Sequence, residues 1–387
     1  MVYLFESKNL STKYVYFLNQ AETNLSTNNR IAVVDFLRGI SLLFVVISNF
    51  MAFQNIEVLN SGLNSILNFL DRSFGKTIWI SLSFLFGFGF WNLIQKTQNK
   101  HRFFNRLFWL LVFGILNSCL YFGDFLKDFA LTGIFCLLAL YISNQKLFKL
   151  TIILTFLIPI IRVFTIRYEV PVFDFRNIES LFESSSFKDI IQYNLSFIKA
   201  YQFQSLNYLI GVHFEMICAM FWGILANRNQ FFSPKNSIWK KIFGFSLFVI
   251  CFIISLKYLT PNSYKSINSF YNLWSVQNIV YSAFLIASFT LFYFKFQHFK
   301  LFQWIEIYGK MTLSNYIGQS LFMLILFYGI GFHLGKNQPL YIYFSWAILI
   351  YFIQLIFSVF WLKHFKLGPI EWIWRSLSER KLIPLKK

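Results

Sequence analysis

Long runs of Phe, Leu and Ile alternate with short polar segments along almost the whole chain. A helix needs about 20 mostly apolar residues to cross the hydrocarbon core of a bilayer, and stretches of about this length recur ten times. The pattern therefore predicts about ten transmembrane helices, with the third and fourth the shortest. The predicted helices occupy roughly residues 31–53, 76–95, 105–122, 124–143, 148–168, 205–226, 242–260, 273–295, 311–332 and 340–362.

The composition supports this interpretation. Of 387 residues, 57% are hydrophobic and only 13% are charged, whereas about 25% of the residues in soluble domains are charged. We therefore expect an all-α, polytopic integral membrane protein whose main partner is the lipid bilayer. The chain divides into a polar segment over residues 1–30, one helical membrane domain over 31–366 and a basic tail over 367–387.

The charged residues indicate the orientation. The chain has 35 Lys and Arg against 16 Asp and Glu, a formal charge of +19. Alternate loops hold roughly twice as many basic residues as the others, and Arg38 is the one base assigned to the interior of a span. Because basic residues favour cytoplasmic loops, we predict that both termini are cytoplasmic. The excess of basic residues then reflects the attraction of these loops to the anionic cytoplasmic leaflet. No nucleic-acid partner is expected.

One long loop, about residues 169–204, lies on the predicted outer side. Its stretch "FKDIIQYNLSFIKAYQF" is amphipathic, which is typical of a helix lying in the membrane interface. A polar connector is the alternative, and the sequence leaves both open.

The first predicted helix, "RIAVVDFLRGISLLFVVISNFMAF", contains Asp35 and Arg38. Each charge costs about 2.5–3.5 kcal/mol near the centre of a membrane helix on insertion scales. Residues three positions apart share a helix face, so the two can pair. Two hypotheses follow. The pair fixes the first helix to its neighbours, or it lines a cytoplasm-facing cavity where Arg38 meets a phosphate or carboxylate.

Other polar residues lie inside predicted spans. His213 is either a packed, hydrogen-bonded side chain or a general base, and Glu215, two positions away, points to a different helix face. The predicted orientation places Asp35, Arg38 and Asn315 toward the inner side, which allows a polar path across the membrane. No Cys, His, Asp or Glu grouping has metal-ligand spacing, so no metal is expected. The polar residues of this path are Asn49, Asn117, Asp124, His213, Glu215, Asn315 and Gln319.

Five ordered blocks resemble a known family. "DFLRGISLLFVVISNFMAF" resembles the first-helix signature of the YeiB-like, or DUF418, family of bacterial inner-membrane proteins. The stretch "FGKTIWISLSFLFGFGF" resembles the second helix of the same family. The stretch "RLFWLLVFGILNSCLYFGDFLKDFALTGIFCLL" resembles its third and fourth helices, where a Gly-Asp opens the fourth helix. The blocks "YGKMTLSNYIGQSLF" and "LGPIEWIWRSLS" complete the match. The resemblance covers nearly residues 30–378.

The resemblance implies a multi-pass protein of the bacterial inner membrane. It also connects the chain to transmembrane acyltransferases, including the acyltransferase-3 proteins and the heparan N-acetyltransferase, by analogy at the level of the fold. Such proteins move an acyl group from a cytoplasmic donor, often acetyl-CoA, to an acceptor across the membrane. On this analogy Asp35, Arg38 and Lys310 bind the donor, and Lys310 replaces the arginine usual in the family.

Two expected histidines are absent. Acyltransferase-3 proteins have one eleven residues after the arginine of "LRG", where this chain has Asn49, and the YeiB-like pattern has one on the third helix, where this chain has Asn117. Asparagine cannot take a proton at neutral pH. On this analogy Asn49 and Asn117 line the transfer path. The remaining candidates for the base are Asp124, His213 and Asp128, an acid of the fourth predicted span, and no family motif assigns that role to any of them.

Two other classes of function stay open. A transporter or exporter of small anionic or amphipathic molecules would also have many spans and scattered polar residues. A non-catalytic relative that senses a ligand or assembles with partners would explain the missing histidines. The sequence predicts neither the acceptor nor the oligomeric state.

Overall fold

The computed structural model describes residues 31–53, 77–97, 100–168, 182–184, 186–233, 236–335 and 338–387. The chain forms two units, Met1–Ala32 and Val33–Lys387. Apart from the first residue of α2, every element below lies in the second unit. The described residues form helices, and their one isolated β-bridge joins Phe365 and Lys386. The all-α prediction is confirmed, and the predicted polar segment, residues 1–30, lies outside the described residues.

Eight helices in the described part of the chain are long and apolar enough to cross a membrane. One of them is composite, because the π-helical segment η6 (Asn207–Val212) runs directly into α10 (His213–Arg228). Each of the eight coincides with a predicted span, so the protein is a multi-pass, all-α membrane protein. The other seven are α2 (Ala32–Met51), α4 (Ile78–Thr97), α5 (Lys100–Leu120), α7 (Asn144–Arg167), α11 (Ile238–Leu259), α13 (Leu273–Phe296) and α16 (Leu340–His364).

Two of the ten predicted spans are shorter. The fourth consists of α6 (Leu126–Gly133) and the 3₁₀ helix η3 (Ile134–Tyr141). Because a 3₁₀ helix rises about 2.0 Å per residue, the two together extend about 28 Å. The ninth is α15 (Thr312–Phe327), which ends where Tyr328 becomes extended. The prediction that the third span is short was wrong: α5 has 21 residues, since its helix starts among the basic residues before the apolar run.

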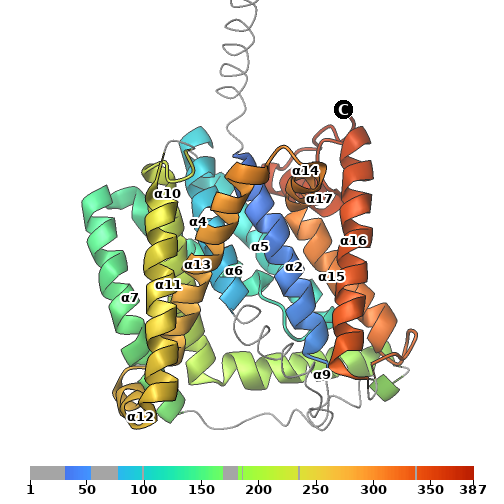
Figure 1. Ribbon diagram of the computed structural model, residues 1–387. Coiled ribbons are helices and arrows are strands. Elements are labelled where there is room, and N and C mark those ends of the chain that lie inside the picture. The colour runs from blue at the N-terminus through green and yellow to red at the C-terminus, as the bar shows by residue number, and fades with distance from the viewer. Residues whose placement is uncertain are drawn as a thin grey trace, which may run out of the picture. The chain divides into compact units, whose positions relative to one another are not determined.

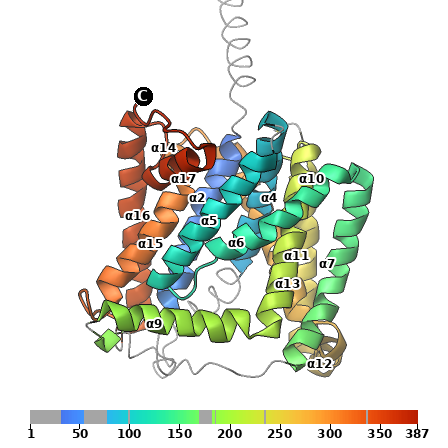
Figure 2. The same cartoon turned by 180° about the vertical axis from the view of Figure 1, so that it is seen from behind.

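Short helices cover both ends of this unit (Figures 1 and 2). The helix α9 (Phe187–Phe197), followed by the π-helical segment η5 (Ile198–Phe203), lies across one end, where α12 (Pro261–Phe270) is also found. At the opposite end lie α14 (Lys300–Gly309), α17 (Pro369–Glu379) and the chain's C-terminus. Following the predicted orientation, we call the end crossed by α9 the outer end and the opposite end the inner end.

Glycines allow the central helices to pack closely. A Cβ at Gly87 of α4 would lie 2.0 Å from the Met220 carbonyl oxygen, and one at Gly223 of α10 would lie 1.9 Å from the Phe84 carbonyl oxygen. Small residues of this kind let two membrane helices approach backbone to backbone. These two glycines therefore bring the backbones of α4 and α10 into direct contact.

The segment predicted to be a basic tail contains α17, which holds two other helices at the inner end. The Glu371 carboxylate accepts hydrogen bonds from the backbone N–H groups of Leu313 (2.6 Å) and Ser314 (3.1 Å), the first residues of α15. A carboxylate at a helix N-terminus also interacts favourably with the helix dipole. Burial raises the pKa of Glu371, and the hydrogen bonds from Ser314 and Leu313 oppose this shift.

A second set of α17 contacts reaches α5. The Trp374 indole N–H donates to the Arg106 carbonyl oxygen at 2.9 Å. Glu379 accepts from Arg375 at 3.0 Å and lies 3.8 Å from both Arg102 and Arg106. Burial alone would raise the pKa of Glu379, but the hydrogen bond from Arg375 and the charges of the three arginines lower it below the ordinary glutamate value. The C-terminal helix thus joins α5 and α15.

Candidate functional site

The turn between α5 and α6 places Asp124 in the interior at the outer end. Its carboxylate accepts from the Asn117 side chain at 2.7 Å and from the Ser118 hydroxyl at 3.4 Å. It also accepts from the backbone N–H of Leu126 at 3.1 Å. Asp124 therefore holds the start of α6, since side-chain oxygens satisfy the free N–H groups of a first helical turn.

The next turn of α6 brings Asp128 against His213 of α10. The Nε2 atom of His213 lies 3.1 Å from Asp128 Oδ1. The other carboxylate oxygen accepts from the Tyr208 hydroxyl at 2.8 Å and from the Lys127 ammonium at 3.4 Å. Asp128 and Lys127 are buried, while the His213 side chain is 16% exposed. This histidine–carboxylate pair joins residues 85 positions apart, which no local spacing reveals.

The hydrogen bonds indicate that the pair holds a proton. His213 Nδ1 lies 2.9 Å from the Leu209 carbonyl oxygen, which can only accept, so Nδ1 carries a hydrogen. Nε2 faces a carboxylate oxygen, and one proton must lie between them. With Lys127 charged, that proton makes the cluster of Asp124, Lys127, Asp128 and His213 electrically neutral. Removing it would leave a net negative charge among buried groups, which is costly.

The π-helical backbone of η6 orients His213. The backbone N–H of His213 donates to the Ile210 carbonyl oxygen, and the side chain rather than the backbone N–H of His213 binds the Leu209 carbonyl. The Tyr208 ring packs against the imidazole at 5.6 Å between centroids. Single π-helical turns often occur at functional sites, and here one places Tyr208 and His213 on the same carboxylate.

Both asparagines that replace expected histidines lie near this cluster. Asn117 donates to Asp124, and the Asn49 side-chain oxygen accepts from the Tyr121 hydroxyl at 3.1 Å. In this cluster the histidine comes from α10. Asn49, Asn117, Asp124 and His213 all lie toward the outer end.

The predicted donor residues lie at the inner end, where α14 crosses α2. Arg38 donates to Asp35 at 3.1 Å, so the predicted pairing is confirmed. Gly309 packs on the backbone of Asp35, since a Cβ there would lie 1.8 Å from the Asp35 carbonyl oxygen. This contact places Lys310 beside the same helix, and its ammonium pairs with Glu306 at 2.6 Å. Asp35 is buried, whereas the Arg38 side chain is 27% exposed.

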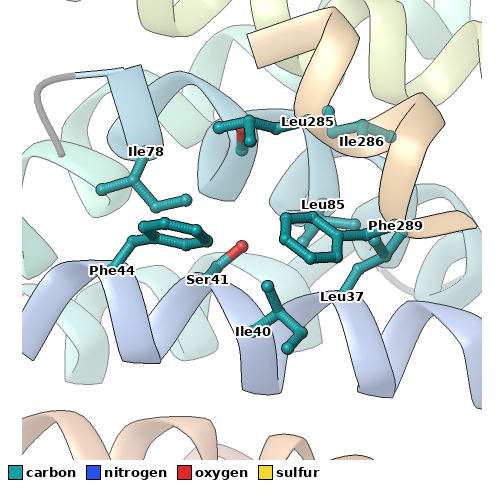
Figure 3. A pocket seen from close by; sticks show the side chains of 10 residues that line it. Leu37, Ile40, Ser41, Phe44, Ile78, Leu85, Leu285, Ile286 and Phe289 are labelled. Atoms are coloured by element: carbon teal, nitrogen blue, oxygen red, sulfur yellow. The ribbon is translucent and has the colours of Figure 1, made fainter. Parts of the chain in front are cut away.

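A small apolar crevice lies between side chains of α2, α4 and α13 (Figure 3). Its free volume is only about 10 Å³, room for about one water molecule, within about 250 Å³ that includes open space. Its polar lining consists of the hydroxyls of Ser41 and Ser81. Arg38 is not one of its lining residues, and its guanidinium reaches toward Gly89 of α4. An alkyl chain would enter this crevice only if the lining side chains moved apart.

One buried ionic site was not predicted from the sequence. Arg162, which lies within the predicted span 148–168, is buried inside α7 and donates to Glu215 of α10 at 3.0 Å. Ser275 donates to the same carboxylate oxygen at 2.5 Å, and Arg162 also binds the Asn207 carbonyl oxygen at 3.1 Å. The signal available in the sequence was a basic residue in one apolar span and an acidic residue in another. Glu215, predicted to line a path, is enclosed by this network.

Asn315 and Gln319 of α15 join neighbouring helices. The Asn315 side chain donates to the Tyr308 carbonyl oxygen (3.0 Å) and the Ser358 hydroxyl (3.1 Å). Gln319 donates to the Leu42 carbonyl oxygen at 3.2 Å and to the Tyr308 hydroxyl at 3.2 Å. Their i,i+4 spacing thus connects α15 to α2, α14 and α16.

The fold and the buried charges define a class, a multi-pass helical membrane protein with ionisable clusters at its two ends. Within that class, residues 226–381 match the family model described as "Protein of unknown function (DUF418)". The blocks with Lys310 and Glu371 lie inside this match. Residues 226–381 are therefore similar to DUF418 proteins, and this part of the chain holds the last two of the five blocks.

Relatives extend the similarity to nearly the whole chain. "Uncharacterized protein YxaH" of Bacillus subtilis (strain 168) is 26% identical over 411 aligned positions, which cover 93% of this chain and 97% of the relative. "Uncharacterized 39.9 kDa protein in amylase 3'region" of Bacillus acidopullulyticus is 26% identical with the same coverage. "Uncharacterized protein YeiB" of Escherichia coli (strain K12) is 36% identical over 95 residues, 24% of each chain.

Proposed function

We propose that the protein is a transmembrane acyltransferase of the bacterial inner membrane. It takes an acyl group from a cytoplasmic donor such as acetyl-CoA and transfers it to an acceptor on the outer side. The observation that carries this proposal is the pair of oriented cations at the inner end, Arg38 beside Asp35 and Lys310 beside Glu306. An acyl donor has the matching chemistry, an anionic phosphate group joined to an apolar chain.

The donor end combines two cations that are already oriented. Arg38 is held by Asp35, and Lys310 is held by Glu306. A guanidinium binds phosphate oxygens in a bidentate manner, and a lysine adds a point charge. Because the Arg38 side chain is partly exposed, it can contact a ligand from the inner end without leaving Asp35. The acyl chain would then extend into the crevice along α2.

The acceptor end supplies proton handling. Transfer breaks the donor's thioester C–S bond and forms a C–O bond at an acceptor hydroxyl, whose proton must finally reach the departing thiolate. The His213–Asp128 pair already holds one proton, so it acts as a relay that accepts a proton as it passes another on. Arg38 and Asn49 are eleven residues apart on α2, or about 16 Å, a distance that the donor's acyl-bearing arm has to bridge.

Thermal stability of the detergent-purified protein tests the donor site. Acetyl-CoA and longer acyl-CoAs should raise the melting temperature saturably, because a ligand that binds only the folded state stabilises it. Each methylene buried in the crevice contributes about 0.8 kcal/mol, so affinity should increase about fourfold per methylene until the crevice is full.

Arg38→Gln should remove this response. Lys363→Gln, which changes an exposed cation of α16, is the matched control and should keep it. A flat response of the wild-type protein to every donor would refute the donor site.

Proton-coupled transport of a small anionic solute is a second candidate. The observation that favours it is the buried, electrically neutral cluster at the outer end, which changes charge when the shared proton leaves. Proteoliposomes distinguish the two functions. Counterflow of a labelled organic anion without any acyl donor, abolished in His213→Asn, would favour transport and exclude the acyl-transfer assignment of this pair.

A further inference from the structure

The His213–Asp128 pair lies at a boundary between the protein interior and its lipid-facing surface. Leu209, one helical turn before His213, is 38% exposed, and Leu131, one turn after Asp128, is 39% exposed. Phe214, next to His213, is also exposed. The pair thus bridges the outward faces of α6 and α10, and the imidazole edge is open between apolar side chains.

The depth of His213 determines what meets that open edge. His213 is six residues from Asn207, where the composite span begins. The α-helical rise would place it about 9 Å in from the outer end of the span, and the tighter π-helical rise of η6 brings it nearer that end. The exposed surface at that depth faces acyl chains and the lower part of the lipid headgroups when the span lies in a bilayer.

We propose that the acceptor reaches His213 sideways from the bilayer and is a lipid-anchored hydroxyl. This inference rests on the proposed acyl transfer and specifies its acceptor class. The anchor chains lie against Leu131, Leu209 and Phe214, and the hydroxyl enters between Tyr208 and His213. The His213–Asp128 pair is thus an acceptor site for a hydroxyl carried by a lipid.

The chemistry of the pair and its rim favours such a ligand over a soluble one. A hydroxyl donates one hydrogen bond and accepts others, so it can join a pair that holds one shared proton. A charged, water-soluble acceptor would lose its hydration among these apolar side chains and gain no opposite charge, since Lys127 and the proton shared with His213 already balance the two aspartates. A lipid enters without that cost because its chains remain in the bilayer.

Photolabelling in nanodiscs tests the site without requiring turnover. The full-length protein is reconstituted with photoreactive phosphatidylglycerol, whose headgroup carries hydroxyls, or with photoreactive phosphatidylcholine, whose headgroup has none. Phosphatidylglycerol should label residues 126–135 and 206–217 several-fold more strongly, and excess unlabelled phosphatidylglycerol should compete. Equal labelling by both probes would mean that these segments meet only bulk lipid, and it would overturn the proposal.

Variants of the rim make the test specific. Leu209→Trp and, independently, Leu131→Trp should reduce the preference for phosphatidylglycerol several-fold by filling the open edge, while the Leu209 carbonyl still binds His213. Phe248→Trp, at a site on α11 that is 68% exposed, is the matched control and should change nothing. An unchanged preference in both rim variants would refute the site.

Different results would refute the proposed acyl transfer and the proposed lipid acceptor site. Selective labelling together with no stabilisation by any acyl-CoA would leave the lipid site and remove the acyltransferase. Acyl-CoA binding without selective labelling would leave the donor site and require an acceptor that arrives from water. In that second case, a spin label attached to the cysteine of Leu131→Cys should be more accessible to a hydrophilic relaxation agent than to oxygen.

Discussion

Replacing Arg162 by methionine should be among the most destabilising single changes in this chain. Arg162 is buried in α7, and its Nε donates to Glu215. Arg162→Met keeps most of the side-chain volume but removes every donor. The Glu215 carboxylate would then remain buried with the Ser275 hydroxyl as its remaining described side-chain partner.

The magnitude follows from the geometry. Removing one partner of a buried ion pair leaves an uncompensated charge and typically costs about 3–5 kcal/mol. Replacing both partners by apolar residues of similar size is often neutral or stabilising. We therefore expect Arg162→Met to lower the free energy of unfolding by about 3–5 kcal/mol, and Arg162→Met with Glu215→Leu to recover most of that loss.

Unfolding with a denaturing detergent, followed by tryptophan fluorescence and helical circular dichroism, measures both changes. A double-mutant cycle that includes Glu215→Leu alone gives the coupling energy of the pair. A loss below about 1 kcal/mol in Arg162→Met would mean that Glu215 is uncharged in the folded protein. Additive losses in the double variant would show that the two side chains do not interact, which would refute the reasoning.

Four further outcomes are expected. Gly309→Ala should cost at least 1–3 kcal/mol of unfolding free energy because its Cβ would meet the Asp35 carbonyl oxygen. Gly244→Ala, on α11 with no atom within 4 Å of its Cβ, should instead stabilise by about 0.5–1 kcal/mol. Glu371→Ala should cost about 1 kcal/mol by uncapping α15, measured by the same titration. The lowered pKa of Glu379 means that its stabilising effect is complete above the unfolded glutamate value of about 4.3 and is lost as pH falls through the lower folded value. Melting temperatures from pH 6 to pH 3 should therefore fall more steeply in the wild type than in Glu379→Gln, and parallel curves would contradict this.

The sequence predicts the helices well because each must satisfy its own backbone in lipid. It also predicts the Asp35–Arg38 contact, because three positions along one helix fix two side chains on one face. The short α15 was not predictable from hydropathy, since the residues after Phe327 are as apolar as those within the helix. The structure ends the helix through the backbone at Tyr328.

Contacts between helices could not be predicted from the sequence. Asp128 lies inside the fourth predicted span, but its pairing with His213 depends on how α6 and α10 pack. Arg162 was missed because it lies near the outer end of α7, where basic residues usually reach water. Its burial results from Glu215 and Asn207, which belong to other helices.

The C-terminal helix α17 also imposes an order on biogenesis. Trp374 binds the backbone of Arg106, 268 residues earlier in the chain. At a synthesis rate of about 5–20 residues per second, α5 waits roughly 15–50 s between its own synthesis and that of its partner. During that interval the inner end of α5 has to be held by the insertion machinery or by lipid. Assembly of this end therefore finishes only after α17 has left the ribosome.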